Sequence, residues 1–435
     1  MAISVSNPHT GVSARVLLLT LASLAVSARL THAQEVFPLA QDPKARALVE
    51  QALADNPSLV AARERTLAAT ARIDRLAALA DPVLSVGYEK GDAWLPGRGA
   101  DTGPRLSVSQ DFPFSGKRQL ARETAGKDAE LTRHATSALS LGVIYEVRKA
   151  LADLLLAREN IAIIRDQRQA TADIEELSRA RYSAGLAGQL DVLRAQAELA
   201  RFDQMRLHEE GLETSAIAEL NRLRARPEGT AVEFAGTLRD LVSRDIAIPN
   251  LADVLAKVHG DSPEERGAAT LVERSSLQLD LARRNLKPDF VLSSSYAFRG
   301  SLPDRFMVEV GVILPAWRNN KQRQAIVEAE ADLRSSRAER EAMTLRTRAA
   351  LEKAYADFKA AVLEARTIEK EVLVIDELAV ESALAGFRSG QTPFISVLEA
   401  HNALYRDRKE HAELLFHVLW HSALLDAFGM QRMTS

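Results

Sequence analysis

No cysteine occurs among the 435 residues of this sequence. The absence excludes a disulfide framework, a cysteine-based metal site and lipid attachment to an N-terminal cysteine after processing. Aromatic residues are also scarce, at 5% of the chain, whereas Ala, Leu, Arg, Glu and Gln are abundant. Such a composition is typical of long helices and coiled coils rather than of a sheet sandwich, so we expect a mainly helical protein.

The chain lacks an excess of charge of either sign, because its 56 basic and 59 acidic residues give a net charge of −3. Proteins that bind nucleic acid need a basic surface for the phosphates, so no nucleic-acid partner is expected. The sequence also lacks a zinc-protease helix motif, a phosphate-binding glycine loop and a nucleophile elbow. We therefore expect neither an enzyme nor a cofactor.

No metal site is predicted either. His417 and His421 are four residues apart and could share one face of a helix. Because no third ligand is evident nearby, we interpret this pair as part of an ordinary helix surface.

Long apolar runs are missing after the N-terminal region, so the sequence predicts no bundle of membrane-spanning helices. Residues 1–33 combine Arg15, the apolar run VLLLTLASLAVSA and small residues before a cut after Ala28 or Ala33. This pattern predicts a secretory signal peptide, with a retained anchor helix as the alternative.

The sequence does contain a turn motif that occurs twice. The stretch RYSAGLAGQLDVLRAQAEL at 181–199 and the stretch FRSGQTPFISVLEAHNAL at 387–404 align when Phe387 is placed under Tyr182. The alignment superposes a glycine, a Val-Leu pair, an alanine and a leucine at one constant offset. A recurrence of this length indicates a duplicated unit.

Proline spacing extends the duplication. Pro57 and Pro82 are 25 residues apart, and so are Pro263 and Pro288. We predict a first structural repeat at 43–226, an equatorial linker at 227–248 and a second repeat at 249–430.

The sequence of each repeat predicts a very long helix that is followed by a hairpin turn. The helices are expected at 117–182 and 321–387, each about 100 Å long at 1.5 Å per residue. Apolar side chains recur every three or four residues along them, so the helices should pack side by side. Turns at 182–190 and 387–395 would reverse the chain, with a glycine at each helix end.

Four short segments alternate between apolar and polar residues, at about 83–90, 105–112, 289–299 and 305–314. A period of two over about ten residues is typical of transmembrane β-strands. The alternative is a pair of half-buried hairpins on a soluble domain. If the segments lie in lipid, four strands cannot close a barrel alone, so several chains must share one.

Together, the signal segment, the two repeats and the turn sequences resemble the TolC family of outer-membrane efflux proteins. The segment SQDFPFSGKRQLARETA at 109–125 is similar to the heavy-metal branch of that family. The resemblance implies a mainly α fold with a small transmembrane β part: a homotrimer whose 12-stranded β-barrel continues into a periplasmic α-helical barrel.

The function that the resemblance implies is passive conduction through the outer membrane of a Gram-negative bacterium. The partners would be outer-membrane lipid, a periplasmic adaptor and an inner-membrane pump of the RND type. Divalent metal cations are one candidate substrate class. The alternatives are an outer-membrane duct for protein or peptide secretion and a soluble periplasmic coiled-coil scaffold.

The resemblance also assigns roles at the turns. Asp191 and Glu399 match acidic residues of the family's narrow periplasmic mouth, whereas Ser396 replaces a second acid and Thr392 replaces an arginine. These two departures leave open whether the mouth is closed at rest. Residues expected to contact the adaptor are Gly185, Leu186, Gly390 and Gln391.

Overall fold

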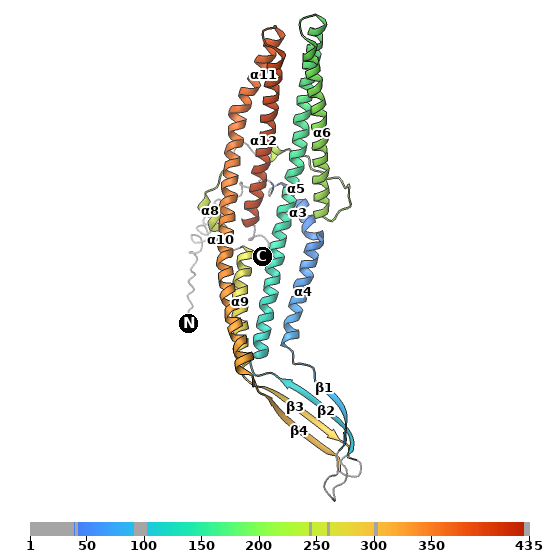
Figure 1. The fold of residues 1–435 in the computed structure, drawn as a ribbon, viewed down its shortest axis with the longest axis vertical. Coiled ribbons are helices and arrows are strands. Elements are labelled where there is room, and N and C mark those ends of the chain that lie inside the picture. The colour runs from blue at the N-terminus through green and yellow to red at the C-terminus, as the bar shows by residue number, and fades with distance from the viewer. Residues whose placement is uncertain are drawn as a thin grey trace, which may run out of the picture. The chain divides into compact units, whose positions relative to one another are not determined.

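A computed structural model describes residue 39 and residues 42–90, 102–242, 246–258, 262–299 and 303–429. The elements follow the order α3 (Pro43–Asp55), α4 (Pro57–Ala77), β1 (Val83–Lys90), β2 (Thr102–Phe112), α5 (Lys117–Ser183), α6 (Gln189–Leu223), α7 (Leu238–Leu241), α8 (Leu251–Val258), α9 (Pro263–Arg284), β3 (Asp289–Ala297), β4 (Arg305–Ile313), η1 (Arg318–Gln322), α10 (Arg323–Thr367), η2 (Ile368–Val372), α11 (Leu373–Arg388) and α12 (Phe394–Gly429) (Figure 1). The predicted fold, mainly helical with a small β part, is confirmed.

The predicted signal peptide at 1–33 lies outside the described residues, as do 91–101 of the first repeat, 243–245 of the linker and 259–261, 300–302 and 430 of the second repeat. The division into two repeats stays a prediction. Contacts instead group the chain into two compact units, each drawing on both predicted repeats. Unit 1 takes its described residues from Met1–Glu50, Tyr145–Val254 and Lys353–Ala427, and unit 2 takes its own from Gln51–Ile144, Leu255–Glu352 and Phe428–Ser435.

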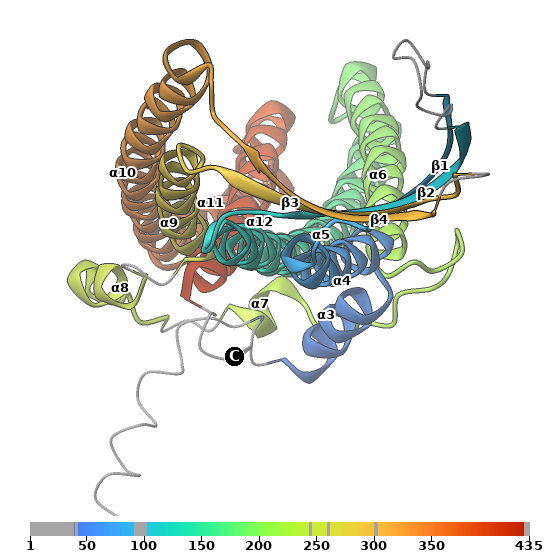
Figure 2. The ribbon, with the colours of Figure 1, turned by 90° about the horizontal axis from the view of Figure 1, so that it is seen from below.

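Unit 2 contains one antiparallel sheet (Figure 2). Its strands pair in the order β1-β2-β3-β4. The register aligns apolar residues in rows across all four strands, as in the row Val86, Leu106, Tyr296 and Phe306. Neighbouring rows on the other face hold small and polar residues such as Ser85, Ser107 and Ser295. The apolar face is exposed to an unusual degree, with Val86 at 78% and Phe306 at 67% of their full accessibility.

The short helices of unit 2 begin with the same signal. The side chain of Asn56 accepts a hydrogen bond from the Ser58 amide at 3.0 Å, and that of Ser262 accepts one from the Glu265 amide at 3.0 Å. Each of these caps is followed by a proline, which suits the first helical position because it needs no backbone donor there. Helix α9 then packs on α10 through a cluster formed by Leu279, Ala282, Ala329 and Leu333.

Unit 1 has a core of leucines on α5, among them Leu151, Leu154 and Leu155, which are fully buried. Beside this core, Arg148 of α5 forms a partly buried ion pair with Asp426 of α12. The linker packs on the same unit: Leu238 is fully buried, and the carbonyl of Phe234 accepts a hydrogen bond from Arg158 at 2.8 Å. The linker is therefore a packed part of unit 1.

One feature of the long helices differs from the expectation. The sequence predicts a near-continuous α-helix at 321–387, because this range contains no proline and no glycine before Gly386. The structure instead inserts the π-helical turn η2 between α10 and α11, closed by the Leu373 amide on the Ile368 carbonyl. A π turn holds one extra residue, so the residues beyond it are rotated by about 100° around the helix axis.

Candidate functional site

The two turns between long helices share one backbone motif. At the first, the Leu186 amide donates to the Arg181 carbonyl at 2.8 Å, and the Gly185 amide donates to the Tyr182 carbonyl at 3.0 Å. At the second, the amides of Gln391 and Gly390 make the equivalent bonds to Gly386 and Phe387, at 2.8 and 3.1 Å. This pair of bonds is the Schellman motif, which ends a helix on a left-handed residue.

Glycine is needed at the left-handed position of both turns. Gly185 has a φ of 73° and Gly390 has a φ of 78°. Other L-residues are strained in this conformation because the Cβ atom approaches the following carbonyl oxygen. The glycines that the sequence aligns are therefore equivalent in structure.

The following helices start in parallel ways, but with different charges. The Asp191 amide donates to the Gly188 carbonyl at 3.2 Å, and the Ser396 amide donates to the Pro393 carbonyl at 3.1 Å. Asp191 thus lies in the first turn of α6, where a carboxylate interacts favourably with the helix dipole. Ser396, at the equivalent position of α12, supplies no charge.

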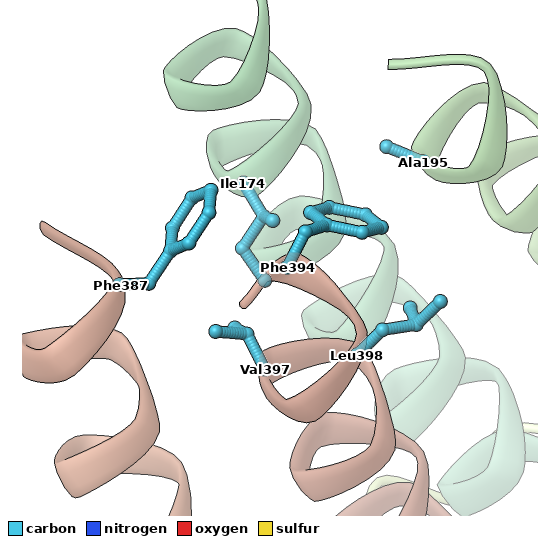
Figure 3. Close-up of a cluster of buried hydrophobic side chains, with 6 residues drawn as sticks. All are labelled: Ile174, Ala195, Phe387, Phe394, Val397 and Leu398. Carbon is cyan, nitrogen blue, oxygen red and sulfur yellow. The ribbon is translucent and has the colours of Figure 1, made fainter. Parts of the chain in front are cut away.

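A buried apolar cluster joins the two hairpins near their turns (Figure 3). Helix α5 contributes Ile174, and α6 contributes Ala195; the other members are Phe387, Phe394, Val397 and Leu398 from α11 and α12. The rings of Phe387 and Phe394 meet edge to face, with centroids 6.1 Å apart. Movement of one hairpin relative to the other would separate these side chains.

Arg181 adds a polar link between the hairpins. Its guanidinium lies over the Phe387 ring, 4.8 Å from the centroid, and its Nη1 donates to the Phe387 carbonyl at 2.6 Å. The equivalent residue of the second turn is Gly386, where a Cβ atom would lie 2.1 Å from Thr392 Oγ1. Position 386 therefore has no room for a side chain, so the second turn cannot make an equivalent contact to the first.

A second polar link connects α5 and α6 within the first hairpin. Glu175 accepts hydrogen bonds from Arg179 at 2.6 Å and from Gln196 at 3.0 Å. The bond from Arg179, followed by that from Gln196, lowers the pKa of the Glu175 carboxyl. The group is therefore ionised at neutral pH and holds the base of the first turn together.

The residues predicted at the sites lie close to these turns. Gly185, Leu186, Gly390 and Gln391 are exposed on the turns, Asp191, Thr392 and Ser396 are half-buried beside them, and Glu399 is exposed on α12. Thr392 is held by its amide, which donates to the Gly386 carbonyl at 3.1 Å. The roles of these residues in a constriction and in adaptor contacts stay predictions.

Sequence reasoning missed three residues of this region. Leu190 and Leu193 are 55% and 52% exposed, and they extend Leu186, which is 69% exposed, into an apolar row. Leu190 and Leu193 are three residues apart on α6, a helical spacing that was available in the sequence, whereas Leu186 lies in the turn before that helix. Arg181 gave no such signal, because its counterpart in the repeat is a glycine.

His417 and His421 stack on each other with ring centroids 5.9 Å apart. Within the part of the chain that the structure describes, no three or more His, Cys, Asp or Glu side chains are grouped so as to hold a metal ion. None of the described helices is both long and apolar enough to cross a membrane.

Comparisons with known proteins found one family model and two curated relatives. A family model described as "Outer membrane efflux protein" matches residues 48–225. The chain is 23% identical over 397 residues to nodulation protein T of Rhizobium leguminosarum bv. trifolii, an alignment that covers 83% of this chain and 80% of that protein. It is 22% identical over 314 residues to the cobalt-zinc-cadmium resistance protein CzcC of Cupriavidus metallidurans, covering 72% and 74% respectively.

The fold is similar to solved structures over nearly its whole length. The outer-membrane channel OprN matches with a TM-score of 0.79 and 21% sequence identity, and the match covers 91% of this chain and 92% of that chain.

Proposed function

We propose, starting from the membership of this chain in the outer membrane efflux protein family, that it forms the outer-membrane channel of a tripartite efflux system. Members of this family are trimeric channels of the Gram-negative outer membrane, not enzymes, and they work with an adaptor and an inner-membrane pump. For this chain we propose a homotrimer that conducts its substrates passively.

The observation that carries the proposal is the exposed apolar face of the sheet. Its rows of Val, Leu, Tyr and Phe run across all four strands, which a soluble scaffold would need to cover. Strands β1 and β4 have one unpaired edge each within the described residues. Because an unpaired edge is costly in lipid, strands from other copies should pair with both edges and close a barrel.

The two turns would then form the periplasmic mouth and meet the adaptor. The exposed apolar row Leu186, Leu190 and Leu193 supports this role for the first turn, since such rows accept the apolar face of a partner helix. We propose an RND-type pump as the source of energy. This chain would form the channel wall, and the periplasmic mouth would open by outward movement of the helical hairpins.

Divalent metal cations are the proposed substrates. The support is the similarity to a protein named for cobalt, zinc and cadmium resistance, together with Glu399. Three copies of an exposed carboxylate around a narrow axis would concentrate cations and repel anions. The secretion-duct alternative has no such support in the residues at the turns.

Two measurements test the proposal. Membrane fractionation should place the protein in the outer membrane as a trimer that resists detergent, whereas a scaffold would wash off without detergent. A deletion strain should lose tolerance to cobalt, zinc or cadmium and regain it from the intact gene. Unchanged tolerance to all three metals would contradict the substrate class while leaving the channel assignment standing.

A further inference from the structure

A dense group of basic residues lies where the sheet of unit 2 meets its helices. We call this group the basic collar: Lys117, Arg118, Arg122, Arg283, Arg284, Lys287, Arg318, Lys321 and Arg323. They belong to three stretches, 112–122, 281–288 and 310–327, and none of these stretches contains Asp or Glu. Acidic residues directly flank the three stretches, at Asp111, Glu123, Asp280, Asp289, Glu309 and Glu328.

Direct contacts bring the three stretches together. Lys117 Nζ donates to the Lys287 carbonyl at 3.0 Å, which joins the start of α5 to the segment after α9. Arg318 Nη2 of η1 donates to the Leu286 carbonyl at 3.3 Å in that same segment. A Cβ on Gly116 would lie 3.2 Å from Arg284 Cζ, so this guanidinium rests on the turn before α5.

Most of the collar has no acidic partner. Lys117 pairs with Asp289, Arg122 with Asp74 and Arg283 with Glu330. The other six members, which make no ion pair with any residue that the structure describes, are all exposed: Arg118, Arg284, Lys287, Arg318, Lys321 and Arg323. Like charges on neighbouring stretches repel one another, so an anion bound among them would stabilise the arrangement.

The collar also adjoins an apolar surface. Beyond the end of β4, Leu314 is 69% exposed and Trp317 is 75% exposed. Leu314 continues the apolar row of Val308, Val310 and Val312, and Trp317 directly precedes Arg318. Exposed tryptophan at the edge of an apolar band is typical of the level of lipid headgroups.

From these observations we infer that the basic collar binds the phosphate groups of anionic phospholipids in the leaflet that faces the periplasm. The inference rests on the proposed function, because it requires the sheet to lie in the membrane. The acyl chains would then lie against the apolar face of the sheet, and Trp317 would sit among the glycerol groups. The basic side chains would reach the phosphates as the cytoplasmic basic segments of other membrane proteins do.

The test uses the full-length protein in detergent, titrated with dioleoylphosphatidylglycerol, dioleoylphosphatidylcholine or inorganic phosphate and followed by native mass spectrometry. The intact protein should bind phosphatidylglycerol at least about a hundredfold more tightly than phosphatidylcholine, and 0.5 M salt should remove most of the difference. The triple variant Lys287→Gln, Lys321→Gln, Arg323→Gln should lose about a hundredfold in affinity for phosphatidylglycerol, since each basic side chain contributes a factor of about five.

Two matched variants complete the design. Arg334→Gln, Arg337→Gln, Arg340→Gln removes the same charge from exposed positions further along α10 and should bind phosphatidylglycerol normally. Lys287→Arg, Lys321→Arg, Arg323→Lys keeps the collar charged and should also bind normally. The latter variant separates loss of charge from loss of folding.

Three results would overturn the inference: equal binding of both lipids by the intact protein, equal loss in the α10 control, or equal binding of inorganic phosphate. Because the titration is made in detergent, it does not depend on insertion into vesicles. Absence of the protein from the outer-membrane fraction would overturn the proposed channel function, whereas failure to prefer the anionic lipid would overturn only the role of the collar.

Discussion

Arg181 of the first hairpin covers the ring of Phe387 of the second and also donates a hydrogen bond to the carbonyl of the same residue, at 2.6 Å. One side chain therefore joins both the ring and the backbone of the opposite turn. In the proposed channel, this contact must break or slide if the hairpins separate. The resembled family has an arginine at the position of Thr392, and a threonine is too short and uncharged to replace it. Arg181 would therefore restrain the closed mouth in place of that arginine.

The first prediction concerns this contact. Arg181→Met keeps an unbranched apolar stem but removes the guanidinium, and with it the hydrogen bond and the cation–π contact, together about 1 to 2 kcal/mol. We expect a mouth that opens more often, measured as higher conductance of the trimer in planar bilayers. Arg165→Met, at an exposed position of α5, is the control and should leave conductance unchanged. Equal conductance of the two variants would show that Arg181 does not restrain the hairpins.

The second prediction compares two glycines. Gly390→Val places a β-branched residue at a φ of 78° and should lower stability by about 1 to 2 kcal/mol while impairing export. Gly211→Ala, on an exposed part of α6 where a Cβ would meet no atom within 4 Å, should raise stability by about 0.5 to 1 kcal/mol. Thermal unfolding and metal export would be measured for both, and an intact trimer is expected in each case. Normal export by Gly390→Val would contradict the assignment of the second turn to the mouth.

A third prediction concerns acid stability. His411 is only 3% exposed, and neither ring nitrogen has a hydrogen-bond partner in the described part of the chain. Burial, and then the positive charge of Arg239, lowers the pKa of His411, although Glu369 acts in the opposite direction. The unfolded chain therefore takes up a proton near pH 6.5 that the folded chain refuses, so stability is lost as pH falls below about 6.5.

The variant His411→Leu should lose less stability than the intact protein between pH 7.5 and 5.5. Melting temperatures at the two pH values would measure this difference. His208→Gln, at an exposed position of α6, provides the control and should follow the intact protein. A pH dependence that is identical in all three proteins would rule out His411 as a source of acid sensitivity.

The fourth prediction concerns ion selectivity in the proposed trimer. Glu399→Gln removes three carboxylates from the mouth and should reduce the preference for cations, whereas Ser396→Asp adds three and should increase it. Reversal potentials in a tenfold KCl gradient measure both effects. Glu381→Gln, on the exposed surface of α11, should leave the potential unchanged. A potential that does not respond to either substitution at the mouth would place the selectivity elsewhere.

Local signals account for the parts of the structure that the sequence predicted. Gly185 and Gly390 could be recognised because few other residues adopt a left-handed backbone, and the strands because apolar residues alternate on one face. These signals depend on neighbours in sequence, so no knowledge of packing is required.

The unpredicted parts depend on contacts between distant segments. The contact of Arg181 with Phe387 requires two hairpins to be placed side by side. The π turn at 368–372 contains neither glycine nor proline, so no local signal in the sequence marks it. Comparison of the repeats gave no sign that Arg181 makes this contact, because the residue aligned with it is Gly386. Leu190 and Leu193 were predictable as an apolar row, but not as an uncovered one.

The two turns share one backbone motif but carry different side chains, and this difference has a consequence for assembly. A closed ring of three such chains would present six loops of the same backbone shape, three carrying an arginine clasp and an uncovered row of leucines, and three carrying neither. A partner that binds in six copies would therefore meet two chemically distinct kinds of binding site in alternation. Its successive subunits would bind with unequal affinity.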